Sequence, residues 1–187
     1  YRTILLVGVE IQSTGLDVST EGRDMAVLFG DGAGAVVLRS TEEPDRGVVS
    51  TNIHAEGEHA EILFGDAPAS WRHPRISAED FEERRIYPSM TGREVFRHAV
   101  TRMPESVEEA LDSSGFEAAD IDLLIPHQAN LRISQMVQKR LGLRDDQVFN
   151  NIQKYGNTTA ATIPIALSEA VSAGRLERGG LLCLTAF

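Results

Sequence analysis

Two short segments of the sequence carry side chains that could do chemistry together. Residues 126–132 read Pro-His-Gln-Ala-Asn-Leu-Arg, and residues 155–161 read Tyr-Gly-Asn-Thr-Thr-Ala-Ala. A neutral imidazole N–H on His127 and the carboxamide N–H of Asn157 can both donate to one oxygen, and an asparagine stays a donor at any working pH because it does not titrate. Preorganised donors stabilise negative charge that develops on an oxygen, by about 2.7–4 kcal/mol per donor in comparable sites.

Taken singly, each residue also has an ordinary explanation, because His127 could cap a helix and Asn157 beside Gly156 is common turn chemistry. The two positions are far apart in the sequence, so only the fold can bring them together. An apolar run at 121–125 predicts a buried strand that Pro126 ends, and a helix is expected at about 130–141. A second, alanine-rich helix is expected at about 159–173, so both motifs lie where strands give way to helices, the usual place for sites in α/β proteins.

The rest of the chain supplies further elements. Strands are expected at 4–10, 33–39 and 180–187, with weaker candidates at 47–55 and 61–64. Residues 90–114 show one apolar stripe at three- and four-residue intervals, which predicts a long helix that Gly115 ends and that Pro104 kinks or divides. Strands that alternate with helices indicate a layered α/β fold.

Two other groups of residues each have a functional and a purely structural interpretation. Residues 29–35 read Phe-Gly-Asp-Gly-Ala-Gly-Ala. A phosphate-binding loop is the sharper interpretation, but no Gly-Lys-Ser/Thr follows, so we favour glycines that allow close approach of backbones. Three histidines, His54, His59 and His73, are interpreted as surface or turn residues, because a metal site would want carboxylate or cysteine partners at tighter spacing.

Composition bounds the class of protein. The chain has 187 residues, 42% hydrophobic and 25% charged, with a formal net charge of -10. These values indicate a globular protein and disfavour nucleic acid as a partner, since affinity for nucleic acid comes mostly from neutralised phosphates. The sequence has one cysteine, no leader before Tyr1 and no apolar run near the roughly 20 residues of a membrane span. These three observations favour a cytoplasmic protein. Because both ends lie in apolar runs, we expect a part of a longer polypeptide.

The two motifs resemble the histidine and asparagine motifs of β-ketoacyl-acyl-carrier-protein synthase III. Four other stretches agree with that family in the same order, at residues 7–10, 29–35, 90–96 and 184–187. Chalcone synthase and hydroxymethylglutaryl-CoA synthase share the Cys-His-Asn chemistry but lack the Gln-Ala-Asn-Leu-Arg continuation, so they fit less well.

The resemblance implies a thiolase-like layered α/β/α fold. Residues 1–43 would be the tail of its N-terminal half, and residues 46–187 would be most of its C-terminal half, with the last strand truncated. The boundary between the two halves falls in the polar stretch at 41–47, which is interpreted as a linker. The family forms homodimers whose edge lies in the first half, so the apolar strand at 4–10 would need cover from that half or from a partner.

The resemblance also implies an activity, the decarboxylative Claisen condensation that initiates fatty acid synthesis. A cysteine takes the acyl group of acyl-CoA, malonyl-acyl-carrier-protein loses CO₂, and the carbanion attacks the acyl-cysteine; no cofactor is implied. His127 and Asn157 would donate to the malonyl thioester oxygen. Cys183 lies in the last expected strand with no helix start after it, so we expect a small buried hydrophobe and no condensation by this chain alone.

Carrier-protein and pantetheine contacts map by resemblance onto Gln128, Ala129, Asn130, Leu131, Arg132 and Gly92. Lys139 and Arg140 either extend this basic patch or merely solvate a helix end. Two other functions stay open: a related acyltransferase of specialised metabolism, and a non-catalytic module that binds carrier protein or acyl chains.

Overall fold

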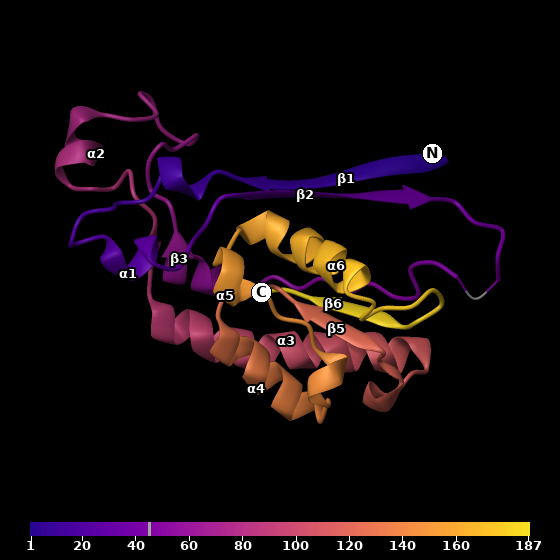
Figure 1. Cartoon of the computed structure of the whole chain (residues 1–187). Coiled ribbons are helices and arrows are strands. Elements are labelled where there is room, and N and C mark those ends of the chain that lie inside the picture. Colours follow the sequence, from indigo (N-terminus) through magenta and orange to yellow (C-terminus); the bar gives the residue numbers. More distant parts are fainter. Residues whose placement is uncertain (45) are drawn as a thin grey trace.

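A computed structural model describes residues 1–44 and 46–187 (Figure 1). Its strands are β1 (Thr3–Glu10), β2 (Gly32–Arg39), β3 (Leu63–Phe64), β4 (Ser89–Met90), β5 (Leu123–Pro126) and β6 (Leu182–Thr185). Its α-helices are α1 (Arg23–Ala26), α2 (Ala78–Glu82), α3 (Gly92–Ser114), α4 (Leu131–Leu141), α5 (Ile152–Tyr155) and α6 (Thr162–Ser172). Two 3₁₀ helices matter below, η2 (Gly57–Ile62) and η5 (Thr159–Ala161).

The parallel pair β5–β6 is the centre of the core, with Leu123 opposite Leu182 and Pro126 opposite Thr185. All four residues of β5 are buried, so this strand is covered on both faces. Leu124 packs into a cluster with residues of α3 and α4, whereas Ile125 packs with Ala166 and Ala170 of α6. The result is the layered α/β/α arrangement that the alternating elements predict, with α3 and α4 on one side of the pair and α6 on the other.

Helix α6 lies between this pair and the antiparallel hairpin β1–β2 (Figure 1). Glycines on the hairpin make the close approach possible, because a Cβ on Gly34 would lie 2.8 Å from Pro164 and one on Gly32 would lie 2.9 Å from the Cβ of Thr158. A Cβ on Gly8 would overlap the carbonyl oxygen of Ala160. The interpretation of the glycines in residues 29–35 as close-approach residues is therefore confirmed at Gly32 and Gly34.

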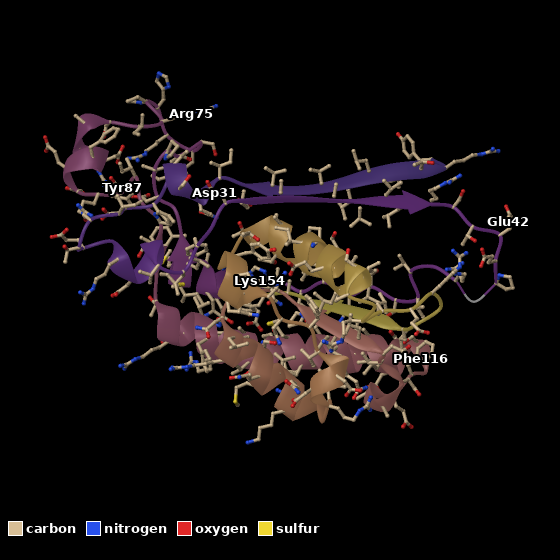
Figure 2. All side chains as sticks on the ribbon, viewed as in Figure 1. Asp31, Glu42, Arg75, Tyr87, Phe116 and Lys154 are labelled. Atoms are coloured by element: carbon tan, nitrogen blue, oxygen red, sulfur yellow. The ribbon has the colours of Figure 1, made fainter. Side chains whose placement is uncertain are left out.

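The apolar pattern of residues 4–10 is typical of a buried strand, but the apolar side chains of β1 are exposed in this structure. Leu5 and Leu6 are each about three-fifths exposed, at 63% and 60%, and Ile4, Val7 and Val9 are half exposed. Figure 2 shows the side chains on the outer side of β1 with no other described element over them. The hairpin has one inner face, packed on η5 and α6, and the apolar residues of its outer face have no cover within the described residues.

Other elements depart from expectation for local reasons. Residues 47–55 are not a strand, because no other described segment pairs with their backbone; Ser50 and Asn52 instead donate to carbonyls of α3. Helix α3 is one element through Pro104, which is buried in the core beside Met103 and Val107. In the stretch expected to be mostly loop, Asp80 of α2 is fully buried and paired with Arg72 at 2.7 Å.

The proposed division into residues 1–43 and 46–187 stays a prediction, and position 45 of the expected linker lies outside the described residues. Among the helices that the structure describes, none combines the length and apolar character needed to cross a membrane.

Candidate functional site

His127 directly follows β5, and its backbone is held to the neighbouring strand. Its N–H donates to the carbonyl of Thr185 at 2.8 Å, which continues the parallel pairing by one residue. Its Nδ1 atom lies 2.6 Å from Oγ1 of Thr162, at the start of α6. The imidazole is largely desolvated, and this burial lowers the pKa of His127 below its ordinary value of 6.5. The ring is therefore neutral at neutral pH.

Asn157 is held by a turn and by the first part of the chain. Gly156 takes a positive φ of 68°, which places Asn157 beside Phe29 in an isolated parallel bridge. The Asn157 N–H donates to the Leu28 carbonyl at 2.8 Å, and its carbonyl accepts from the Gly30 N–H at 3.0 Å. Its Oδ1 accepts from the N–H of Thr159 at 2.8 Å, so the amide nitrogen Nδ2 points away from the turn. Nδ2 has no hydrogen-bond partner within the described part of the chain.

The structure connects these two side chains through one turn. Thr162 Oγ1 contacts His127, and it also lies 2.8 Å from the carbonyl of Thr159, whose N–H holds the Asn157 carboxamide. The chain of contacts therefore runs from His127 through Thr162 and Thr159 to Asn157. Both predicted residues are anchored to the same short segment, η5 and the first residue of α6.

The Thr162 hydroxyl has one proton and two neighbours that compete for it. A carbonyl only accepts, so the bond to Thr159 consumes that proton and requires His127 to donate from Nδ1. In that tautomer the neutral ring has a bare Nε2, which accepts. If the hydroxyl instead donates to Nδ1, then Nε2 carries the hydrogen and becomes a donor, at the cost of the bond to Thr159.

The Gln128 side chain is used inside the fold, and its expected contact with a carrier protein or with pantetheine stays a prediction. Its side chain is 3% exposed, and both ends are used internally. Nε2 donates to the Pro126 carbonyl at 2.7 Å, and Oε1 accepts from the N–H groups of Asn151 at 3.0 Å and Ile152 at 3.2 Å. Gln128 thus ties the His127 segment to the segment that leads to Asn157.

The other predicted contact residues are placed differently. Asn130 is the N-cap of α4, and its Oδ1 accepts from the Arg132 N–H at 2.9 Å. Ala129 packs against the α3–α4 core. Leu131 is 40% exposed and Arg132 is exposed, and Gly92 is exposed at the start of α3. Leu131, Arg132 and Gly92 are thus accessible to a partner.

Arg140 does not extend the basic patch, because it is used within the fold. Its guanidinium lies 3.4 Å from Glu108 and 3.6 Å from Glu105 and donates to the Thr101 carbonyl at 3.2 Å, which ties α4 to α3. Lys139 is exposed on the same helix.

Cys183 lies within β6, and burial raises the pKa of its thiol to about 11. A thiol with that pKa is protonated at neutral pH and is a poor nucleophile. Cys183 is partly buried and packs against the α3–α4 core, as a small hydrophobic residue does.

Sequence reasoning missed Thr159 and Thr162, although both lie in or next to the second motif. The signal was a threonine two and five residues after Asn157, a spacing that a 3₁₀ turn folds back onto the asparagine. It also missed Glu56 and His98, which meet His59 at a separate place described below.

Comparisons with known proteins agree on one family. Residues 111–187 match the family described as 3-oxoacyl-[acyl-carrier-protein (ACP)] synthase III C terminal, and residues 1–57 match that described as 3-oxoacyl-[acyl-carrier-protein (ACP)] synthase III. The β-ketoacyl-[acyl-carrier-protein] synthase III of Acidiphilium cryptum (strain JF-5) is 47% identical over 99% of this chain and 54% of its own length. That of Roseiflexus castenholzii (strain DSM 13941 / HLO8) is 45% identical over 100% of this chain and 55% of its own length.

Solved structures show the same fold. The crystal structure of 3-oxoacyl-[acyl-carrier-protein] synthase III from Aquifex aeolicus VF5 matches with a TM-score of 0.85 and 39% identity, over 99% of this chain and 54% of that one. The priming β-ketosynthase of the R1128 polyketide pathway matches with a TM-score of 0.81 and 30% identity, over 98% of this chain and 52% of that one. The fold is thus thiolase-like, as expected, and the chain spans about half the length of the relatives it matches.

Proposed function

The chain belongs to the 3-oxoacyl-[acyl-carrier-protein] synthase III family, and from this membership we propose that the protein carrying it catalyses the decarboxylative condensation that initiates fatty acid synthesis. An acyl group from acyl-CoA is transferred to a cysteine. Malonyl-acyl-carrier-protein then loses CO₂, and the carbanion attacks the acyl carbon and releases the cysteine. The proposed reaction requires no resident cofactor.

In this proposal His127 and Asn157 donate to the thioester oxygen of the malonyl group. The observation that carries the proposal is that both side chains hydrogen-bond to the Thr159–Thr162 turn, with Nε2 of His127 and Nδ2 of Asn157 left without partners among the described residues. Two held N–H donors stabilise the enolate that forms as CO₂ leaves.

A neutral His127 can donate from Nε2 only if Nδ1 accepts. The Thr162 hydroxyl must therefore give its proton to Nδ1 and release the Thr159 carbonyl. Because one neutral hydrogen bond contributes about 0.5–1.5 kcal/mol net, the two arrangements are close in free energy and the substrate oxygen can select the donor form.

We propose that the nucleophile lies outside these 187 residues. Cys183, the one cysteine of the sequence, has a thiol whose pKa burial raises to about 11. The chain by itself would then neither accept an acyl group nor condense one.

The carrier protein is proposed to dock on the exposed side of α4. Arg132, Met136 and Lys139 are spaced so that they share one helical face, and all three are exposed. This face offers two positive charges around an apolar centre to an acidic partner. The uncovered outer face of β1 supports a homodimer, or cover by other parts of the protein.

An acyltransferase of specialised metabolism is the second candidate, and the 30% identity to a polyketide priming ketosynthase is the observation for it. The identities of 39–47% to proteins named β-ketoacyl- or 3-oxoacyl-[acyl-carrier-protein] synthase III favour the first candidate.

The test uses the complete protein with acyl-CoA and malonyl-acyl-carrier-protein. The expected products are CO₂ and a β-ketoacyl-carrier-protein, detected by mass spectrometry. His127→Ala and Asn157→Ala should remove decarboxylation and spare acylation of the cysteine, while His54→Ala, at an exposed histidine paired with Glu109, serves as control. Absence of decarboxylated product, or equal loss of both steps in the variants, would overturn the proposal.

A further inference from the structure

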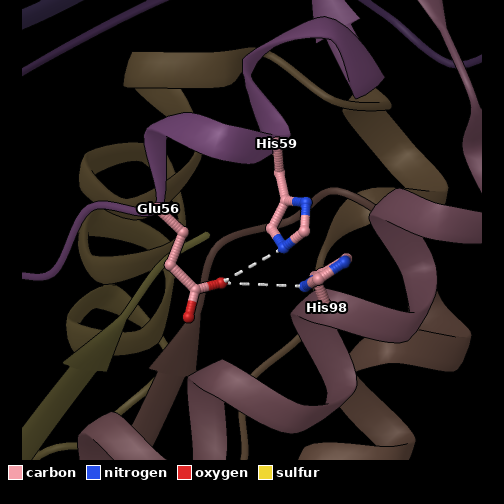
Figure 3. A group of neighbouring side chains, drawn as sticks. All are labelled: Glu56, His59 and His98. Atoms are coloured by element: carbon pink, nitrogen blue, oxygen red, sulfur yellow. Dashed lines mark ion pairs between the residues drawn. The ribbon is translucent and has the colours of Figure 1, made fainter.

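Three side chains that the proposed reaction does not use meet on one side of α3. Glu56 precedes η2, His59 lies within it, and His98 projects from α3 (Figure 3). One carboxylate oxygen and one ring nitrogen from each histidine all lie within 4.8 Å of one another. Within residues 1–44 and 46–187, this is the one group of three or more His, Cys, Asp or Glu side chains with such geometry.

The three atoms surround a gap that no direct hydrogen bond closes. Glu56 Oε2 lies 4.0 Å from His59 Nε2 and 3.8 Å from His98 Nδ1, both beyond hydrogen-bond length (Figure 3). At zinc bond lengths of roughly 2.0–2.1 Å, two tetrahedral ligands lie about 3.3 Å apart. The two glutamate–histidine pairs must therefore close by about 0.5 and 0.7 Å, which rotamer adjustment of the partly exposed Glu56 and His59 can supply.

The other oxygen of Glu56 is already held. Arg102 pairs with Oε1, and the same guanidinium donates to Glu105 at 2.9 Å. This arrangement leaves Oε2 directed at the two rings, in the manner of the outer partners that orient metal-binding carboxylates. The carboxylate is thus positioned from behind by a residue that is not itself a ligand.

The two imidazoles are positioned by packing. The rings of His59 and His98 have centroids 4.3 Å apart, and His98 stacks on Phe187 at 6.5 Å with an interplanar angle of 9°. The His98 side chain is only 13% exposed. A hollow of about 200 Å³ adjoins the group and is lined largely by apolar residues, among them Ile62, Leu63 and Val95, so there is room for a water or another fourth ligand.

The His54–Glu109 pair is a histidine–glutamate contact without a third ligand, and it serves as a comparison for the three-residue group. Its Nε2 and Oε2 atoms lie 2.7 Å apart, in direct contact, with no second histidine. The three-residue group differs because it has a third donor and an open centre.

We propose that Glu56, His59 and His98 form a binding site for a divalent late transition metal, with zinc as the ion that fits the donors. Two imidazoles and one carboxylate with a free fourth position match zinc, whereas magnesium and calcium take oxygen ligands. This assignment does not depend on the condensation chemistry and can be tested without it.

The test is a titration of the metal-stripped protein with Zn²⁺ by calorimetry, with Co²⁺ as a visible-absorption probe of the site. One ion should bind per chain. His59→Ala and His98→Ala should each weaken Zn²⁺ binding by at least the roughly 10- to 100-fold that loss of an outer partner costs elsewhere. The matched control His54→Ala should bind as the unaltered protein does, and Mg²⁺ should not compete.

His98 is packed, so its variant is checked by circular dichroism. If it fails to fold, His59→Ala and Glu56→Gln decide, because these side chains are only partly buried. Absence of stoichiometric Zn²⁺ binding would overturn the assignment. So would unchanged affinity in His59→Ala, or an equal loss in His54→Ala.

Discussion

Nδ1 of His127 lies 2.6 Å from Oγ1 of Thr162, and the same hydroxyl lies 2.8 Å from the carbonyl of Thr159. The position of the hydroxyl proton therefore decides whether Nε2 of the imidazole can donate to a substrate. Thr162 is a positioning residue in this arrangement, since it acts through His127 and not on the substrate.

Replacing Thr162 by valine keeps the side-chain shape and removes the hydroxyl. We expect the decarboxylation rate of the complete protein to fall by about 10-fold, because Nδ1 of His127 loses its partner. Thr162→Ser should restore most of the rate, and the KM for malonyl-acyl-carrier-protein should change little in either variant. Equal rates for the valine and serine variants would contradict the role.

The pH dependence follows from the burial of His127, which lowers its pKa below 6.5. Between that lowered pKa and 6.5 the unfolded chain binds more protons than the folded one, so acidification through this range should reduce the free energy of unfolding. Protonation puts a hydrogen on both ring nitrogens and removes the acceptor at Nδ1 that the Thr162 hydroxyl uses in the proposed donor form. The acid limb of decarboxylation that His127 sets should therefore have its midpoint below pH 6.5.

An NMR titration of the ring C–H signals checks this, with His127→Asn used to assign the resonance. A midpoint at or above 6.5 for His127 would contradict the argument.

The docking face on α4 predicts an effect of charge on carrier binding. Arg132→Ala should weaken binding of the carrier protein and reduce its salt dependence, because an exposed positive charge at the interface is lost. Arg144→Ala is the control, since Arg144 is an exposed arginine just beyond the far end of α4 that pairs with Asp146 at 3.0 Å. Surface plasmon resonance at low and high salt measures both, and equal loss in the two variants would argue against this face.

Cys183→Ala tests where the nucleophile is. Acylation of the complete protein by acyl-CoA should persist in this variant, because the thiol of Cys183 has a pKa of about 11 and is not ionised at neutral pH. Intact-mass spectrometry detects the acyl adduct. An adduct that disappears with Cys183 while circular dichroism is unchanged would place the nucleophile here after all.

A methyl group on the inner face of the hairpin tests the packing. Gly34→Ala should lower the free energy of unfolding by about 1–3 kcal/mol, since its Cβ would lie 2.8 Å from Pro164. Gly15→Ala is the matched control, because nothing lies within 4 Å of its Cβ. Urea unfolding of both variants gives the comparison, and equal stabilities would contradict the close approach.

Local signals predicted most element positions and ends. Gly115 and Gly142 have the positive φ values of helix ends, 76° and 66°, as their places after apolar-periodic segments indicated. The helix expected at 130–141 is α4 (Leu131–Leu141), with Asn130 as its cap. Such features depend on a few neighbouring residues, and the sequence displays them directly.

What could not be predicted depends on partners distant in the chain. The burial of β1 depends on what covers its outer face, and a strand at 47–55 would need a neighbour to pair with, neither of which an apolar pattern specifies. Gln128 lies in a motif that suggested contact with a partner, yet its Oε1 accepts from backbone N–H groups more than 20 residues away. His98 and His59 are 39 residues apart in the sequence, and only the packing of η2 on α3 brings them together.

The place of α6 between two sheets has a consequence for the chemistry. The helix begins with Thr162, and its alanines 166 and 170 are completely buried against β5 while Pro164 touches the hairpin. The spacing between the β1–β2 hairpin and the β5–β6 pair therefore sets where the Thr162 hydroxyl lies relative to Nδ1 of His127. A substitution that changes the distance between the two sheets, even at a residue far from any substrate, would change which ring nitrogen of His127 carries the hydrogen.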